Sequence, residues 1–86
     1  MEPHEVIRYP LMTEAASLMI EQENKLVFIV DLKSNKHDVK KAVEDLYDVE
    51  VDSVNVLITP QAEKKAFVTL SPEYKATDVA IKLGVL

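Results

Sequence analysis

The amino-acid sequence predicts a small α+β domain, a two- to three-layer α/β sandwich with a mainly antiparallel sheet of three to four strands. Two runs rich in β-branched residues, 25–31 and 49–59, flank a segment of helical periodicity at 35–47. A third run, 63–70, follows the second after a short loop, which favours an antiparallel hairpin. With the hairpin partner between the first two strands, the arrangement is a ferredoxin-like split β-α-β. At 86 residues, the chain is expected to form a single domain over residues 1–86.

The outer elements are marked by proline and by capping residues. Residues 4–10 close on Pro10, so we expect a brief edge strand or an extended arm. Apolar residues at helical spacing predict one helix over 13–24 and another over 76–84. The expected start and stop residues are Thr13 and Asn24 for the first helix, and Thr77 and Gly84 for the second.

The central unit is the strand 25–31 followed by the helix 35–47. The strand KLVFIVD is apolar on both faces, which is typical of a central strand or of a sheet covered on both sides. Asn35 is expected to cap the helix, with Asp38 where a capping box places an acidic side chain. One apolar stripe runs along this helix, formed by Val39, Ala42, Val43, Leu46 and Tyr47.

Alternation along the hairpin predicts which side chains share a face of the sheet. In the strand 49–59, Asn55 lies on the opposite face from the apolar row Val54, Val56 and Ile58. In the strand 63–70, Phe67 and Lys65 share a face, so Phe67 is the one aromatic considered for stacking on nucleic acid. For Asn55 two interpretations stay open, a satisfied structural amide or an amide offered to a partner.

Composition and spacing argue against several classes of function. Without cysteine, the chain has no disulfides or thiolate metal sites, and its single glycine, Gly84, leaves no Gly-rich phosphate loop. No stretch approaches the roughly 18 apolar residues of a membrane span, and Glu2 and Glu5 precede any apolar run, unlike a secretory signal. His4 and His37 do not stand at metal spacing. We therefore expect no enzyme, no catalytic residues, no metal, no cofactor, no small-molecule substrate and no membrane insertion.

The charge is acidic overall but segregated along the chain. The formal net charge is -5, which by itself argues against nucleic acid. Residues 25–41 nevertheless hold five Lys against two Asp, whereas residues 42–63 hold six acids and no base. The fold can therefore gather a basic face and an acidic one.

The lysines of the basic segment crowd the start of the predicted helix 35–47. One interpretation is a solubilising helix face with weak pairs such as Lys40–Glu44. Against it, cations at a helix start are unfavourable by roughly 0.3–1 kcal/mol, and such a start binds anions through its free N–H groups. Lysines placed there suit a phosphate backbone better than they suit the helix.

Several segments together resemble a known family. RYPLMTEAA, KLVFIVDLKSNKHDVKKAVEDLYDVEVDSVNVLIT and EKKAFVTLSPEYKATDVAIKLG are similar to the large-subunit ribosomal protein family twenty-three, in its archaeal and eukaryotic type. The motifs are Arg-x-Pro before Thr-Glu, the Asn-Lys helix start, Val-x-x-Val-Asn and Lys-Lys-Ala. The loop TPQAE is too short for the tunnel-entering hairpin of bacterial relatives, and Ala15 stands where many relatives have Lys.

The resemblance implies a structural constituent of the large ribosomal subunit, located in the cytoplasm on the ribosome. Family members bind large-subunit rRNA at the peptide exit tunnel, beside neighbouring large-subunit ribosomal proteins. They contribute to the docking site for nascent-chain factors such as the signal recognition particle, and Glu14 matches the family's docking position. The positions that match its RNA-binding motifs are Arg8, Lys33, Asn35, Lys36, Lys40, Asn55, Lys64 and Lys65. The alternative is a free-standing ferredoxin-like protein-interaction or regulatory domain that does not bind RNA.

Overall fold

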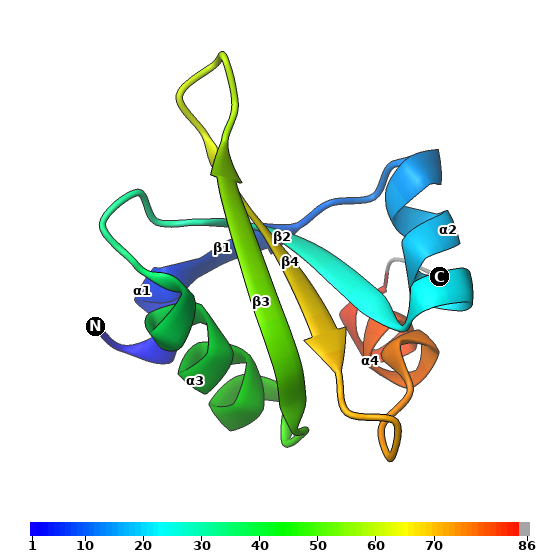
Figure 1. Cartoon of the computed structure of the whole chain (residues 1–86). Helices are drawn as coiled ribbons and strands as arrows, with labels where there is room; N and C mark the ends of the chain where they lie inside the picture. Colours follow the sequence, from blue (N-terminus) through cyan, green and yellow to red (C-terminus); the bar gives the residue numbers. More distant parts are fainter. Residues whose placement is uncertain (85–86) are drawn as a thin grey trace.

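The structure is a computed structural model that describes residues 1–84 (Figure 1). Residues 85 and 86, which the predicted domain includes, lie outside the described residues. The elements in order are α1 (Pro3–Val6), β1 (Ile7–Pro10), α2 (Glu14–Glu23), β2 (Lys25–Val30), α3 (Lys36–Tyr47), β3 (Val51–Ile58), β4 (Lys64–Leu70) and α4 (Ala76–Leu83). Within residues 1–84, every helix is too short or too polar to cross a membrane.

The strands form one sheet in the order β1-β2-β4-β3, with every neighbouring pair antiparallel. Because β4 lies between β2 and β3, those two strands run in the same direction, and α3 is the crossover between them. The predicted α+β class, the antiparallel sheet and the split β-α-β arrangement are therefore confirmed. β2 is central, and five of its six residues are buried, as its apolar sequence predicted.

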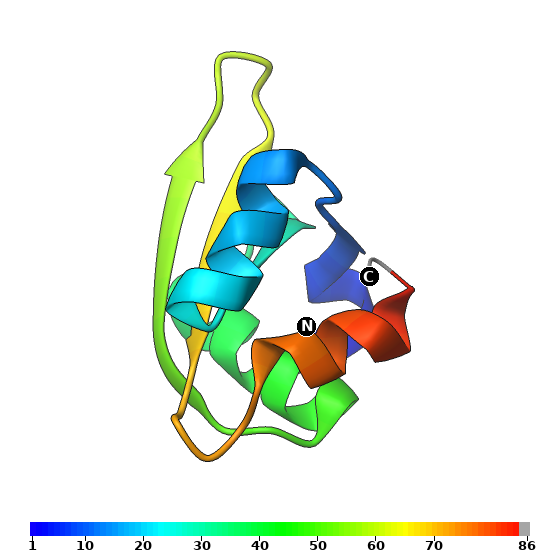
Figure 2. The same ribbon diagram turned by 90° about the vertical axis from the view of Figure 1, so that its right-hand side faces the viewer.

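Helices α3 and α4 cover one face of the sheet (Figure 2). On this face Leu26, Val68 and Val54 form a cross-strand row, each no more than 7% exposed. Val39, Ala42 and Val43 of α3 pack on it, and the Phe28 and Tyr47 rings stack with centroids 5.9 Å apart. Each fully buried Val, Leu or Phe side chain in this core stabilises the fold by about 1.5–3 kcal/mol. Leu46, predicted within the same stripe, is 43% exposed, and nothing in the structure explains its departure.

Side-chain caps set two helix starts as predicted. The Thr13 hydroxyl oxygen accepts the Ala16 N–H at 3.1 Å and so begins α2. At α3, Asn35 Oδ1 accepts the Asp38 N–H at 2.9 Å, and Asp38 Oδ2 accepts the Asn35 N–H at 3.0 Å. The expected capping box is therefore closed in both directions.

The first element differs from the sequence prediction. Residues 4–10 do not form one strand or arm, because α1 occupies Pro3–Val6 and only the remainder pairs with β2. Pro3 at the first helical position has a backbone preset for the helix, and the Glu2 N–H donates to Glu5 Oε1 at 3.1 Å. These local contacts favour a single helical turn where we expected extended chain.

The start of α4 also differs, because Thr77 does not cap it. Lys75 is the N-cap without a side-chain bond, and the Ala76 N–H donates to Asn24 Oδ1 at 2.7 Å. Asn24 itself ends α2 in the left-handed conformation, with φ 56°. Its amide nitrogen also donates to the carbonyl oxygens of Leu70, Ser71 and Tyr74. One asparagine therefore joins the end of α2, the end of β4 and the start of α4.

Candidate nucleic-acid interface

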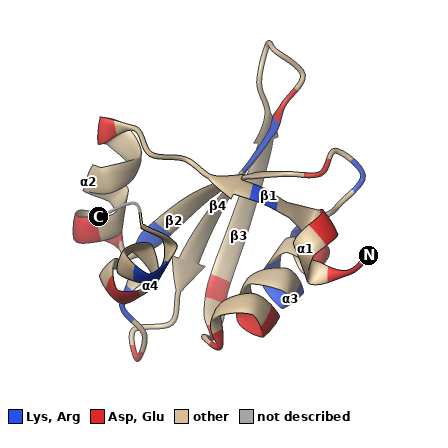
Figure 3. Cartoon of the chain, turned by 180° about the vertical axis from the view of Figure 1, so that it is seen from behind, with Lys and Arg blue, Asp and Glu red and all other residues tan. Residues whose placement is uncertain are grey.

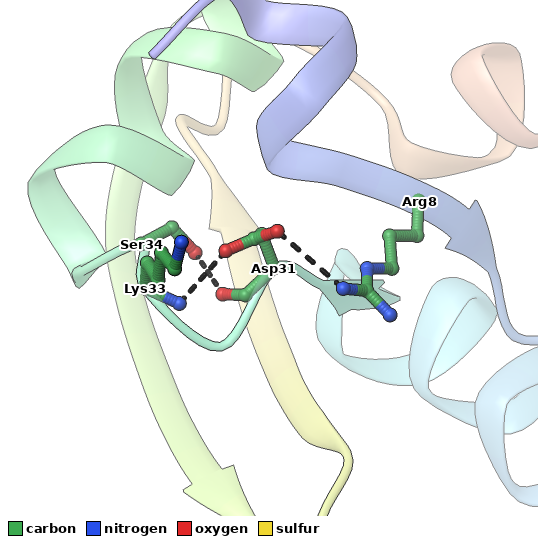
Figure 4. Close-up of polar contacts among 4 residues, drawn as sticks. All are labelled: Arg8, Asp31, Lys33 and Ser34. Carbon is green, nitrogen blue, oxygen red and sulfur yellow. Dashed lines mark hydrogen bonds and ion pairs between the residues drawn. The ribbon is translucent and has the colours of Figure 1, made fainter.

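The loop before α3 is held by Asp31 (Figure 4). Asp31 Oδ1 accepts the Lys33 N–H at 2.8 Å, and Asp31 Oδ2 lies 3.4 Å from Arg8 Nη2. The backbone hydrogen bond from Lys33, followed by the Arg8 guanidinium, lowers the pKa of Asp31 below its ordinary value. The Ser34 hydroxyl donates to the Asp31 carbonyl oxygen at 2.6 Å and is buried. The loop thus presents the Lys33 side chain outward from a fixed backbone.

Lys36 and Lys40 stand one turn apart at the start of α3, and both are exposed. Together with His37 they line a hollow of about 260 Å³ against Ser53 and Val54 of β3. The helix start and the edge of the sheet therefore form one continuous surface. Asn35 is less available to a ligand, because its side-chain oxygen is used in capping α3.

The weak ion pairs that the solubilising interpretation placed on α3 are not formed among residues 1–84. The ion pairs there are Arg8–Asp31 and Lys25–Glu23. Glu44, the partner of Lys40 in that interpretation, instead accepts the Val51 N–H at 2.9 Å and so joins α3 to β3. The Lys36 and Lys40 ammonium groups therefore have no carboxylate partner in this part of the chain.

The lysine pair before β4 is divided between the two faces of the sheet. Lys64 is in register with Val30 and Ile58, and its ammonium group donates to the Ser34 carbonyl oxygen in the loop before α3. Lys65 points to the other face, as strand alternation requires. Lys64 therefore belongs with the α3 start, and the structure does not bring it together with Lys65.

The second group of predicted residues lies on the face of the sheet opposite α3, which we call the open face. Its members come from all the strands and are Tyr9, Val27, Ile29, Ser53, Asn55, Leu57, Lys65, Phe67 and Thr69. Asn55 is directly opposite Phe67, and its exposed amide makes no side-chain hydrogen bond among the described residues. That observation favours the interpretation in which Asn55 is offered to a partner.

Sequence reasoning did not single out Tyr9 or Ser53. Tyr9 is in register with Ile29 on the open face, and its hydroxyl donates to Glu63 Oε2 at 3.0 Å. This hydrogen bond raises the pKa of Tyr9 above its ordinary value. Ser53 follows an irregularity in the pairing of β3 and β4, which allows Val51 and Val54 both to face the core. Alternation alone does not give that pattern.

Charge is distributed against the dipole of α3 (Figure 3). Its first half holds three lysines against Asp38, while Glu44, Asp45 and Asp48 lie at its end. A charge of this sign within the first or last turn of an exposed helix is unfavourable by roughly 0.3–1 kcal/mol. Glu14 lies apart from this region, exposed in the first turn of α2. The basic surface and the predicted docking position are therefore separate.

The comparison with protein families adds a finding that is independent of this geometry. The family described as ribosomal protein L23 matches residues 5–84, which is nearly the whole chain.

Residues 1–84 contain no group of three or more His, Cys, Asp or Glu side chains arranged to hold a metal ion.

Proposed function

Because the chain belongs to the ribosomal protein L23 family, we propose that it binds large-subunit rRNA through the α3 start and the open face of the sheet. In this role it is a structural constituent of the large ribosomal subunit, on the ribosome in the cytoplasm, with no catalytic activity. Residues 1–86 act as one domain. Its other partners are neighbouring large-subunit proteins at the peptide exit tunnel.

The proposal depends mainly on the position of Lys36 and Lys40 at the start of α3 and on the absence of carboxylates paired with them among residues 1–84. Lys36 stands in the first turn of α3, where the helix dipole disfavours a cation, and Lys40 stands one turn further on. Neither has a carboxylate partner among residues 1–84. Phosphate oxygens meet both the lysines and the dipole at such a position. Lys33 and Lys64 extend the same surface through the loop that precedes α3.

A salt titration of rRNA binding tests this assignment. If both lysines contact phosphates, the Lys36→Ala/Lys40→Ala variant should flatten the slope of log affinity against log salt by about 2. The matched control is Lys75→Ala/Lys82→Ala, which removes the same charge beside α4 and should leave the slope near that of the wild type. Equal slopes for the two double variants would reject the α3 contacts.

Sedimentation of a tagged copy in a cell lysate tests the wider role. Co-migration with large ribosomal subunits at moderately high salt, lost after RNase treatment, is the expected result. A chain that stays at the top of the gradient, with none on subunits, would favour the alternative of a free-standing protein-interaction domain.

We also propose that the chain is of the archaeal and eukaryotic type and that α2 contributes to the docking site for the signal recognition particle. The β3–β4 loop is tight, since the Thr59 N–H donates to the Glu63 carbonyl oxygen at 2.8 Å and Ala62 is left-handed. A loop this tight supports the archaeal and eukaryotic type, because it leaves no hairpin extension that could enter the tunnel. Exposure of Glu14 beside Met12 and Leu18, which are 67% and 47% exposed, supports docking of the signal recognition particle at α2.

A further inference from the structure

A cleft separates α2 from the open face of the sheet. β1 pairs with only the last three residues of β2, and the Leu11 N–H donates to the Val27 carbonyl oxygen at 2.9 Å just beyond it. Thr13 then starts α2, which contacts β2. Ile20 of α2 joins the core, while Met19 lines the cleft. The cleft has a volume of about 130 Å³.

The walls of the cleft combine an aromatic ring, apolar side chains and one cation. Phe67 and Val27 come from the sheet, Ala15 and Met19 from α2, and Lys65 is the charged residue that lines the cleft. Phe67 is only partly buried, whereas Phe28 on the covered face is 0% exposed. The ring thus keeps an accessible surface that the core does not use.

We propose that this cleft holds one unpaired base of a bound RNA, stacked on Phe67. The inference rests on the proposed function, since the RNA is the ligand of the same open face. Lys65 is two residues from Phe67 on that face, where it can pair with the phosphate of the inserted nucleotide. Asn55, directly opposite Phe67, offers an amide donor and acceptor to the base edge.

The chemistry of the cleft favours a base over other occupants. Bases splayed out of RNA loops stack on aromatic side chains and are read at their hydrogen-bonding edges. A duplex presents phosphates and sugars instead, and these polar groups do not match the mainly apolar walls of the cleft. An apolar side chain from a protein would fill the volume but would form neither an ion pair with Lys65 at the wall of the cleft nor a hydrogen bond with the exposed Asn55 amide beside Phe67. A nucleotide matches all three groups, because its base stacks on Phe67, its phosphate pairs with Lys65 and its base edge bonds Asn55.

Titration of the isolated full chain with nucleoside monophosphates tests the cleft without rRNA. Amide resonances of Ala15, Val27 and Phe67 should shift with at least one of the four nucleotides, and Ala15→Leu, which narrows the cleft, should abolish the shifts. Ribose 5-phosphate, which lacks a base, should not produce them. Shifts equal to those from ribose 5-phosphate would reduce the site to a phosphate contact, and no shift with any nucleotide would overturn the proposal.

Binding to rRNA provides the second test. Phe67→Leu keeps apolar volume but removes the stacking ring, so affinity should fall about 5- to 100-fold. The salt slope should change by no more than about 1, because no lysine is removed and only the Lys65 phosphate contact depends on the inserted base. Ile81→Ala is the control, since it removes exposed apolar surface on α4, where Ile81 is 62% exposed. Thermal unfolding of each variant confirms that it is folded.

The two proposals fail in different ways. A wild-type chain that does not bind rRNA rejects the proposed function. The nucleotide titration still shows whether the cleft binds a base. A chain that binds rRNA with the lysine-dependent salt slope, but with the same affinity in Phe67→Leu, retains the function and loses the inserted base.

Discussion

Replacement of Asn24 by alanine should be among the most damaging changes to a partly exposed residue of this protein. Its side chain accepts the Ala76 N–H at 2.7 Å and donates to the Tyr74 carbonyl oxygen at 2.9 Å. These partners lie about fifty residues further along the chain, so Asn24 fixes α4 to the rest of the fold. Asn24→Ala removes these two hydrogen bonds, together with the longer ones to the Leu70 and Ser71 carbonyl oxygens, and also places an alanine at φ 56°.

The two effects have separate magnitudes. The two short hydrogen bonds, to Tyr74 and Ala76, contribute about 2 kcal/mol at about 1 kcal/mol each, and alanine in the left-handed conformation adds at least about 1 kcal/mol. The expected loss of about 3 kcal/mol is a large part of the 5–15 kcal/mol that is typical of a whole domain. For a chain of this size it corresponds to a fall in Tm of about 12–24 °C.

Asp48→Ala is a matched control for the backbone effect. Asp48 ends α3 at φ 55°, nearly the same conformation, and its side chain makes no hydrogen bond among the described residues. We therefore expect a backbone cost of about 1 kcal/mol, reduced by the roughly 0.3–1 kcal/mol that is recovered when the acidic charge at the end of α3 is removed. Asn24→Gly, which relieves the backbone but loses the hydrogen bonds, should cost about 2 kcal/mol.

Urea denaturation followed by circular dichroism measures these differences, provided that the m-values of the variants agree. The expected order of destabilisation is Asn24→Ala, then Asn24→Gly, then Asp48→Ala. If Asn24→Ala and Asp48→Ala lose the same free energy of unfolding, the amide hydrogen bonds contribute nothing and the reasoning is refuted.

Two further predictions concern charged groups. Because the pKa of Asp31 is lowered in the folded state, its contribution to stability is present above its ordinary pKa of 3.8 and is lost as pH falls through the folded value. Asp31→Asn should therefore reduce the dependence of unfolding free energy on pH below that point, and an unchanged acid titration would contradict the contact with Lys33. At α2, Glu14→Lys should weaken binding of purified signal recognition particle to reconstituted subunits about fivefold, roughly 1 kcal/mol. Glu73→Lys, the same charge reversal in the β4–α4 loop, should not, and equal loss in both would remove the special role of Glu14.

Local chemistry in the sequence determined which segments became helices and strands. Thr13 and Asn35 cap α2 and α3 through contacts within three residues, so their signals are readable without the fold. The apolar run of β2 predicted a central strand, and the short loop after β3 predicted the hairpin. These features depend on hydrogen bonds and alternation between near neighbours, and for that reason they were predicted correctly.

The tertiary structure alone decided how the basic residues are used. The alternation of side chains along β4 places Lys64 and Lys65 on opposite faces of the sheet. Only the packing of α3 determines which face is covered and brings Lys64 to the Ser34 carbonyl oxygen. Likewise, Glu44 fits a helix-face ion pair in the sequence but bonds the Val51 N–H in the fold. The cleft beside Phe67 exists because β1 ends early and α2 takes its place. Such contacts join segments that are distant along the chain, so no short-range pattern of residues encodes them.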